Sequence, residues 1–95
     1  MVRLTSVSQT PEEEVVKVEG WLNGEDVILL AQMGEKVRQR GARLVLDLAG
    51  VRSIDEEGLA LLASWAGPQL GLRRSSLFVR TLLQRRGLTQ EGENG

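Results

Sequence analysis

Hydrophobic and polar positions follow two rhythms along this chain, a period of two typical of strands and a longer period typical of helices. The segments VRLTSV (2–7) and VVKVEGWL (15–22) both alternate with a period of two, and the charged turn TPEEE separates them. Because a short loop joins the two segments, we expect them to form an antiparallel pair of strands.

The segment NGEDVILLAQMGEKVRQRG (23–41) has helix signals at both ends. Asn23 is a candidate N-cap, acids follow it in the first turn, and Gly41 can adopt the left-handed stop. One face is formed by small or apolar residues, namely Val27, Leu30, Ala31, Gly34 and Val37. Since glycine inside a helix costs about 1 kcal/mol relative to alanine, Gly34 predicts a close approach of this helix to the sheet.

Two more helices and two more strands are expected in the second half of the chain. The segment ARLVLDLAGV (42–51) is apolar on both sides, as expected for a central parallel strand, and QLGLRR (69–74) is a weaker edge-strand candidate. A helix is expected from Asp55 to Ala66. The segment SSLFVRTLLQRRGL (75–88) predicts another, capped by Ser75 or Ser76 and ended by Gly87 and Leu88, with a buried stripe of Phe78, Val79, Leu82 and Leu83.

The predicted element order is therefore ββαβαβα, which indicates a single α/β domain with a mixed sheet of about four strands and helices packed on it. We expect the domain to span residues 1–88 and residues 89–95 to form a flexible tail. The predicted core consists of Val45, Leu46, Leu48, Leu59, Leu62, Val79 and Leu82.

Composition excludes much familiar chemistry. The chain has 95 residues and a net charge of −1, so nothing in its overall charge favours nucleic acid or membrane binding. It has no cysteine and no histidine, which removes disulfides, thiolate or imidazole metal sites and the usual general base. No apolar run approaches the roughly 20 residues that span a bilayer, and the N-terminus lacks a signal-peptide core. We expect a soluble cytoplasmic domain without a cofactor.

Three consecutive acids and a glycine stand between the central strand and the second predicted helix. Asp55 is placed to be the helix N-cap, and Glu56 and Glu57 fall in the first turn, where the helix dipole favours negative charge. Gly58 allows a neighbouring backbone to come close. These acids are either simply good helix starters or part of a contact surface, because partners of α/β sheets tend to meet the carboxyl ends of parallel strands.

At these residues the chain resembles a known family. LVLDLAGVRSIDEEGLALLASW (44–65) resembles the signature of STAS domains, the family named for sulfate transporters and anti-sigma-factor antagonists: an apolar strand, Asp-Leu, a short turn and Asp-x-x-Gly-Leu opening a helix. SLFVRTLLQRRGL (76–88) is similar to the last helix of that family. The resemblance extends over about residues 2–88 and implies a protein-interaction module without catalytic residues.

The resemblance also places Glu57 at a regulatory position. In the anti-sigma antagonists, a serine just before the glycine is phosphorylated by the partner kinase, which switches partner binding off. Glutamate cannot accept that phosphate, so we expect the switch to be absent here. Glu57 either mimics a permanent phosphoserine or is a helix cap, and the second is favoured because a carboxylate carries about half the charge of a phosphate at pH 7.

Three classes of function follow. The first is a regulatory module that binds an anti-sigma factor or a kinase-like protein, and the second is the small STAS subunit of a lipid-transporting ABC system, which would bind its ATPase. The third and weakest is an enzyme that uses the three carboxylates, alone or through a metal, since no other convergent polar group is visible. The expected partner-binding residues are Asp55, Glu56, Glu57, Gly58, Leu61 and Trp65.

Leu61 and Trp65 in this set have two possible roles. They are four residues apart and therefore share one side of the helix. As an exposed pair they would be anchors for a partner, because exposed apolar patches with aromatic residues commonly mark binding sites. Alternatively, Trp65 is covered and belongs to the core, since tryptophans are highly buried on average.

Overall fold

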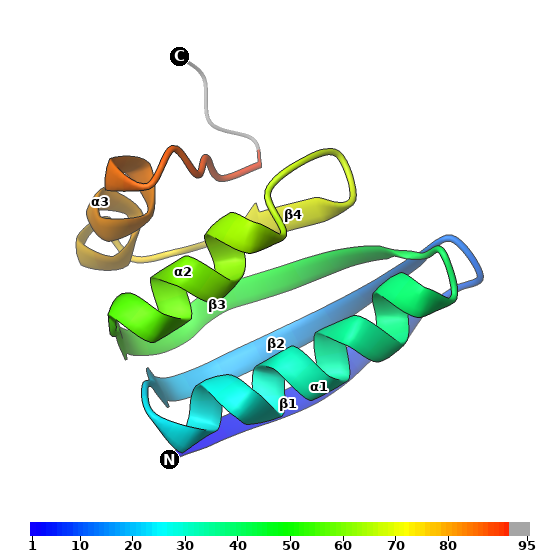
Figure 1. Cartoon of the computed structure of the whole chain (residues 1–95), viewed down its shortest axis with the longest axis horizontal. Coiled ribbons are helices and arrows are strands. Elements are labelled where there is room, and N and C mark those ends of the chain that lie inside the picture. Colours follow the sequence, from blue (N-terminus) through cyan, green and yellow to red (C-terminus); the bar gives the residue numbers. More distant parts are fainter. Residues whose placement is uncertain (92–95) are drawn as a thin grey trace.

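The computed structural model describes residues 1–91, and its elements follow the predicted order (Figure 1). They are β1 (Val2–Gln9), β2 (Glu13–Leu22), α1 (Glu25–Gln39), β3 (Arg43–Ile54), α2 (Glu56–Ser64), β4 (Leu70–Arg73) and α3 (Leu77–Arg85). The strands form one mixed sheet in the order β1-β2-β3-β4. β1 and β2 are antiparallel, whereas β2, β3 and β4 are parallel to one another, so the predicted fold class is confirmed.

β3 is the strand that positions the acidic turn. It is 12 residues long and lies between β2 and β4. It continues past the predicted end at residue 51 as far as Ile54, and therefore leads directly into Asp55. The weak strand candidate at 69–74 is β4, which pairs with β3 over four residues.

The helices pack on the sheet around one apolar core. Figure 1 shows α1 and α2 side by side over one face of the sheet, with α3 beside the end at which β3 finishes. Leu46 of β3, Leu30 of α1 and Leu62 of α2 are fully buried in this core. All predicted core residues are buried except Leu82, which is partly buried. No helix within residues 1–91 is long and apolar enough to cross a membrane.

Phe78 corrects the prediction for the third helix. We expected it in the buried stripe of α3, but its side chain is 60% exposed, whereas Val79 and Leu83 are buried. Ser76 is the N-cap of α3, and its hydroxyl accepts a hydrogen bond from the Val79 N–H at 3.2 Å. The face of α3 that meets the core runs through Val79 and Leu83, and Phe78 lies about 100° around the helix from Val79.

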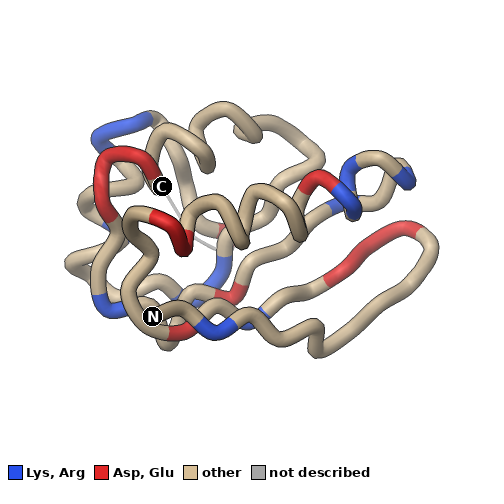
Figure 2. Tube along the Cα trace, turned by 60° about the horizontal axis from the view of Figure 1, so that its bottom comes forward, with Lys and Arg blue, Asp and Glu red and all other residues tan. Residues whose placement is uncertain are grey.

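The sheet face opposite the main core carries ion pairs. Val45 is fully buried there, although it is not part of the main apolar cluster. Around it, Arg43 contacts Glu13 at 3.6 Å and Arg74 forms an ion pair with Asp47 at 2.5 Å. This face of the sheet is therefore polar, and its charges are largely paired. A separate acidic stretch lies near the turn of the β1–β2 hairpin, apart from the acids that begin α2 (Figure 2).

The first residues of the expected C-terminal tail contact the domain. The Glu91 N–H donates to the Leu72 carbonyl of β4 at 2.7 Å, and the Glu91 carboxylate pairs with Arg43 and Arg73. The Gln90 side-chain oxygen accepts hydrogen bonds from Ser75. Residues 89–91 thus run beside the outer edge of β4, and residues 92–95 of the expected tail lie outside the described residues.

Candidate partner-binding site

Asp55 joins the starts of α1 and α2. Its Oδ1 accepts a hydrogen bond from the Gly58 N–H at 2.8 Å, which is the predicted N-cap of α2. Its Oδ2 accepts from the Gly24 N–H at 3.1 Å, at the start of α1. The predicted cap at Asn23 is wrong: Gly24 is the N-cap of α1, and α1 has no side-chain cap of its own. One carboxylate therefore fixes two helix N-termini side by side.

Gly58 packs tightly against the residues at the ends of β2 and β3. It is buried, and an added Cβ would lie 2.8 Å from Ile54 Cγ1 and 3.1 Å from the Leu22 carbonyl oxygen. Since real Cβ atoms almost never come that close, a larger residue would push α2 away from the sheet. Close packing accounts for a glycine at this position, and its expected contact with a partner stays a prediction.

Glu56 and Glu57 point to different sides of α2. The Glu56 side chain is 80% exposed and forms an ion pair with Arg86 at the end of α3. Glu57 is also exposed, and it lies four and eight residues before Leu61 and Trp65, so these three share the other side of the helix. The three carboxylates therefore do not converge on one point.

Trp65 belongs to the core, so the interpretation as an exposed partner anchor is wrong. Only 4% of it is exposed. Its Nε1–H donates to Glu35 Oε1 at 3.0 Å, and the Arg38 guanidinium lies 5.8 Å from the ring centroid. The ring fills the space beside Gly34, where an added Cβ would lie 2.2 Å from Trp65 Cη2. The close approach predicted from Gly34 is thus to α2 rather than to the sheet.

Two contacts fix how α1 and α2 lie against each other. Gly24 is bonded to Asp55 at their starts, and Gly34 meets Trp65 ten residues later in each helix. The helices therefore run parallel at nearly the same level, and α2 presents its Glu57–Leu61–Trp65 side to α1. On α1, Ile28 lies seven residues before Glu35, which bonds Trp65, so Ile28 is on the side that faces α2.

These relations define a surface that we call the α1–α2 patch, made of Ile28, Glu57 and Leu61. Ile28 is 57% exposed, Glu57 is exposed and Leu61 is partly buried against the core. Each residue of α1 is level with the residue 31 positions later in α2, as Gly24 is with Asp55 and Gly34 with Trp65. Ile28 is therefore level with residue 59, between Glu57 and Leu61. Glu25 in the first turn of α1 and Glu57 in the first turn of α2 are the acids nearest to it along the two helices, whereas Asp26 and Glu56 point to other sides. The patch is apolar with an acidic rim.

Ile28 is a site residue that sequence reasoning missed. A signal was present, because Ile28 is an apolar residue outside the face of α1 that supplies the core. An exposed apolar residue of this kind is informative only once the buried face is known. The contact with Asp55, which decides where Ile28 lies relative to Glu57, joins residues far apart in the chain.

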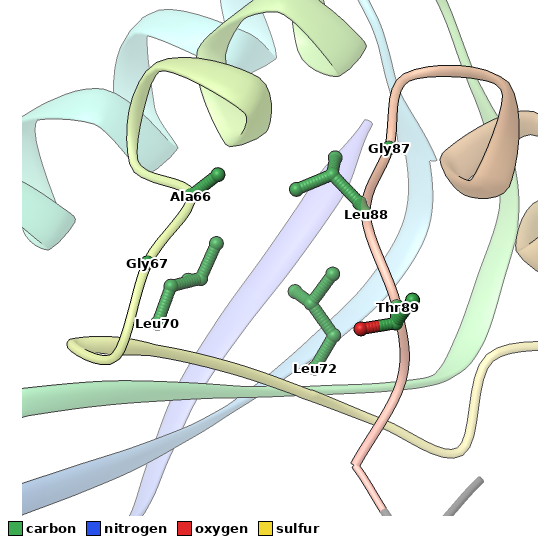
Figure 3. A pocket seen from close by; sticks show the side chains of 7 residues that line it. All are labelled: Ala66, Gly67, Leu70, Leu72, Gly87, Leu88 and Thr89. Atoms are coloured by element: carbon green, nitrogen blue, oxygen red, sulfur yellow. The ribbon is translucent and has the colours of Figure 1, made fainter. Parts of the chain in front are cut away.

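Two small cavities lie away from the acidic turn. One of about 230 Å³ is lined by Arg38, Gly41, Ala42 and Gln69. Another of about 100 Å³ lies between the end of α2, β4 and residues 87–89, and in Figure 3 the side chains of Leu70, Leu72 and Leu88 point into it. Ligand pockets usually enclose about 300–1,000 Å³. Within residues 1–91, no group of three His, Cys, Asp or Glu side chains is placed to hold a metal ion.

Two carboxyl groups with clearly lowered pKa values lie away from the patch, among the ion pairs of the opposite sheet face. The hydrogen bond from Arg74 lowers the pKa of Asp47. Burial acts to raise the pKa of Glu91, but hydrogen bonds from Arg43 and Arg73 together with their charges lower it on balance. Both groups are partners in structural ion pairs, which explains the shifts without catalysis.

Comparisons with known proteins place the chain in a family. The profile of the family described as "Mlab, STAS domain" matches residues 5–90, so the chain belongs to the STAS domain family. The fold is similar to the solved structure described as "Structure of the Anti-Sigma Factor Antagonist SpoIIAA in its Unphosphorylated Form", with a TM-score of 0.70 and 17% identity. That match covers 97% of this chain and 90% of the other. A search of curated proteins gave no match.

Proposed function

We propose that this protein is a non-catalytic regulatory module that binds a partner protein through the α1–α2 patch. The observation that carries the proposal is the exposed Ile28 beside Glu57 and Leu61, at the helix starts that Asp55 holds together. Family membership and the fold shared with an anti-sigma factor antagonist support a regulatory role. The expected partner is an anti-sigma factor or a kinase-like protein.

The acidic rim indicates the chemistry of the partner surface. Five carboxylates stand at the starts of α1 and α2. Asp55 accepts from two backbone N–H groups, Asp26 lies 3.9 Å from the Met1 nitrogen, and Glu56 forms an ion pair with Arg86, which leaves Glu25 and Glu57. Glu25 and Glu57 favour a partner with lysine or arginine side chains around an apolar centre, because complementary charge speeds and orients association. Such binding should weaken as the salt concentration rises.

Regulation by phosphorylation is expected to be absent at the acidic turn. Glu57 stands where the family resemblance puts the phosphorylated serine, and a carboxylate cannot accept phosphate. Ser53 is a poor substitute because it lies within β3, paired with Trp21 of β2, two residues before the helix cap. We therefore expect the binding state to be set by the concentration of the partner rather than by a kinase.

An alternative is the STAS subunit of a lipid-transporting ABC system, which would bind the ATPase. The observation that favours it is the family description, which carries the name Mlab, together with the non-phosphorylatable Glu57. The genes beside this one would separate the two roles. A sigma factor or anti-sigma kinase favours regulation, and a permease with an ATPase favours transport.

The test is a quantitative pull-down from the native host with variants of the patch. Ile28→Ser and Glu57→Lys should each reduce recovery of the specific partner several-fold while leaving the fold intact, because both side chains are exposed. Glu12→Lys is the matched control, since it makes the same charge change at an exposed site in the β1–β2 hairpin. Equal recovery with Glu57→Lys, Ile28→Ser and the wild-type protein would contradict the proposed site.

A further inference from the structure

The two edges of the sheet differ in how they are covered. The outer edge of β4 is met by residues 89–91, whose Glu91 N–H bonds the Leu72 carbonyl. β1 is the other edge, and within residues 1–91 no strand pairs with its outer side. β1 is eight residues long and contains no proline or lysine. Open strands of this kind are templates for pairing with another strand, and proteins usually protect them.

A register shift restricts where a new strand could pair. The ladder of β1 with β2 is irregular between Ser6 and Ser8, which places a bulge at Val7. Bulges bend the strand and interrupt regular pairing. The regular and open part of β1 is therefore the segment from Val2 to Ser6, which is centred on Leu4.

An apolar rim borders this segment on the helix side. Asp26, Leu29 and Met33 share one face of α1 because they are three and seven residues apart. The Asp26 carboxylate lies 3.9 Å from the backbone nitrogen of Met1, so this face is turned toward β1. Leu29 is 49% exposed, and Met33 and Leu4 are partly buried against the core. This face of α1 is different from the one that carries Ile28.

The charges of β1 suit pairing with itself. Its single charged residue is Arg3, which faces Glu19 across the β1–β2 ladder. In an antiparallel pair centred on Leu4, Arg3 of one copy lies opposite the neutral Thr5 of the other, so like charges do not meet. The two Leu4 side chains then lie together beneath the rims formed by Leu29 and Met33.

We propose that a second copy of this chain pairs with β1 edge to edge, antiparallel about a two-fold axis near Leu4. The two four-stranded sheets then form one sheet of eight strands. This arrangement satisfies both open edges at once and closes, because the β4 edges are covered. The regular part of β1 is limited to Val2–Ser6 in each copy, so we expect the dimer to be weak and to depend on concentration. It leaves the α1–α2 patch free, and the inference does not rest on the proposed function.

Charge substitutions at Thr5 test the pairing. Thr5 is exposed but lies opposite Lys17 in the β1–β2 ladder, so the urea unfolding of each variant is measured as well, and only a change in association at equal stability counts. Thr5→Lys should weaken the dimer by about tenfold, because symmetry creates two like-charge pairs with Arg3. Thr5→Glu should dimerise at least as tightly as the wild-type protein, since each glutamate faces Arg3 of the other copy. Thr81→Lys, an exposed site on α3, is the matched control and should dimerise like the wild-type protein.

Sedimentation equilibrium from micromolar to millimolar protein measures the association, and hydrogen exchange locates it. We expect the amides of residues 2–6 to become more protected as the concentration rises. A wild-type protein that stays monomeric at millimolar concentration would overturn the proposal. So would a dimer that Thr5→Lys and Thr81→Lys affect equally, or one that Thr5→Glu dissociates as completely as Thr5→Lys does.

Discussion

Replacing Gly34 by alanine should destabilise this protein, although alanine is the better helix former. Gly34 is in the middle of α1, and an alanine Cβ would lie 2.2 Å from Trp65 Cη2 and 2.8 Å from both Cζ2 and Cζ3. Ordinary carbon contacts are about 3.5–4.0 Å. The indole would have to move by more than about 1 Å. Its Nε1 bond to Glu35 and its almost complete burial oppose that movement.

Two opposing contributions, helix propensity and overpacking, set the change in the free energy of unfolding. Alanine gains about 1 kcal/mol over glycine in a helix interior. Overpacking a well-filled core typically costs about 1–3 kcal/mol. Because the clash is with the rigid outer ring of a tryptophan rather than a flexible chain end, we expect a cost near the upper end and a net loss of about 1–2 kcal/mol.

Urea unfolding followed by far-ultraviolet circular dichroism measures the change, and a second background shows its cause. Trp65→Phe removes the outer ring, so Gly34→Ala in that background should stabilise the protein by about 1 kcal/mol. The sign of the alanine effect should therefore reverse between the two backgrounds. If Gly34→Ala stabilised the protein with Trp65 present, the assignment of Trp65 to the α1–α2 contact would be refuted.

Three other substitutions test the fold and the acidic turn. Asp55→Ala should cost about 2–3 kcal/mol in urea unfolding, because it removes an N-cap and the bond to the start of α1, whereas Glu12→Ala should change stability by less than about 0.5 kcal/mol. The lowered pKa of Glu91 contributes stability that is present above its ordinary pKa of 4.5 and is lost as the pH falls through the folded-state pKa. Glu91→Gln should therefore be less stable than the wild-type protein at neutral pH, and the difference in their free energies of unfolding should shrink as the pH is lowered. A difference that grows on acidification would refute the ion pair. With an anti-sigma kinase and ATP, intact-mass analysis should show no phosphate at residues 55–58 of the wild-type protein and one on Glu57→Ser; phosphate on wild-type Ser53 would contradict the loss of the switch.

Much of the fold is predictable because its signals are local. The alternation in β1 and β2, the apolar run of β3 and the cap at Asp55 each act within a few residues of sequence. The apolar run of β3 predicts burial on both of its faces, and Val45 is indeed buried although it lies outside the main core. Phe78 was misplaced because two adjacent apolar residues in a short helix allow more than one phase.

The site was less predictable because its contacts are non-local. We predicted that Asn23 caps the start of α1, but the side chain that accepts from the Gly24 N–H there is Asp55, 31 positions along the chain. Trp65 is covered because α1 has a glycine at the matching level, which no pattern within α2 reveals. The position of Ile28 beside α2 follows from the same two contacts between α1 and α2. The spacing of residues in the sequence therefore predicted the acidic turn. The packing of α1 against α2 determines that Trp65 is buried and that Ile28 lies beside this turn.

The most direct test of the proposed site is to map it by nuclear magnetic resonance. The ¹⁵N-labelled protein is titrated with the purified partner recovered in the pull-down, and the amide shift changes are followed residue by residue. We predict that the changes concentrate in the first turns of α1 and α2, at Ile28, Glu57 and Leu61 and their neighbours. Changes confined to β1, to α3 or to the ion-paired face of the sheet would contradict it.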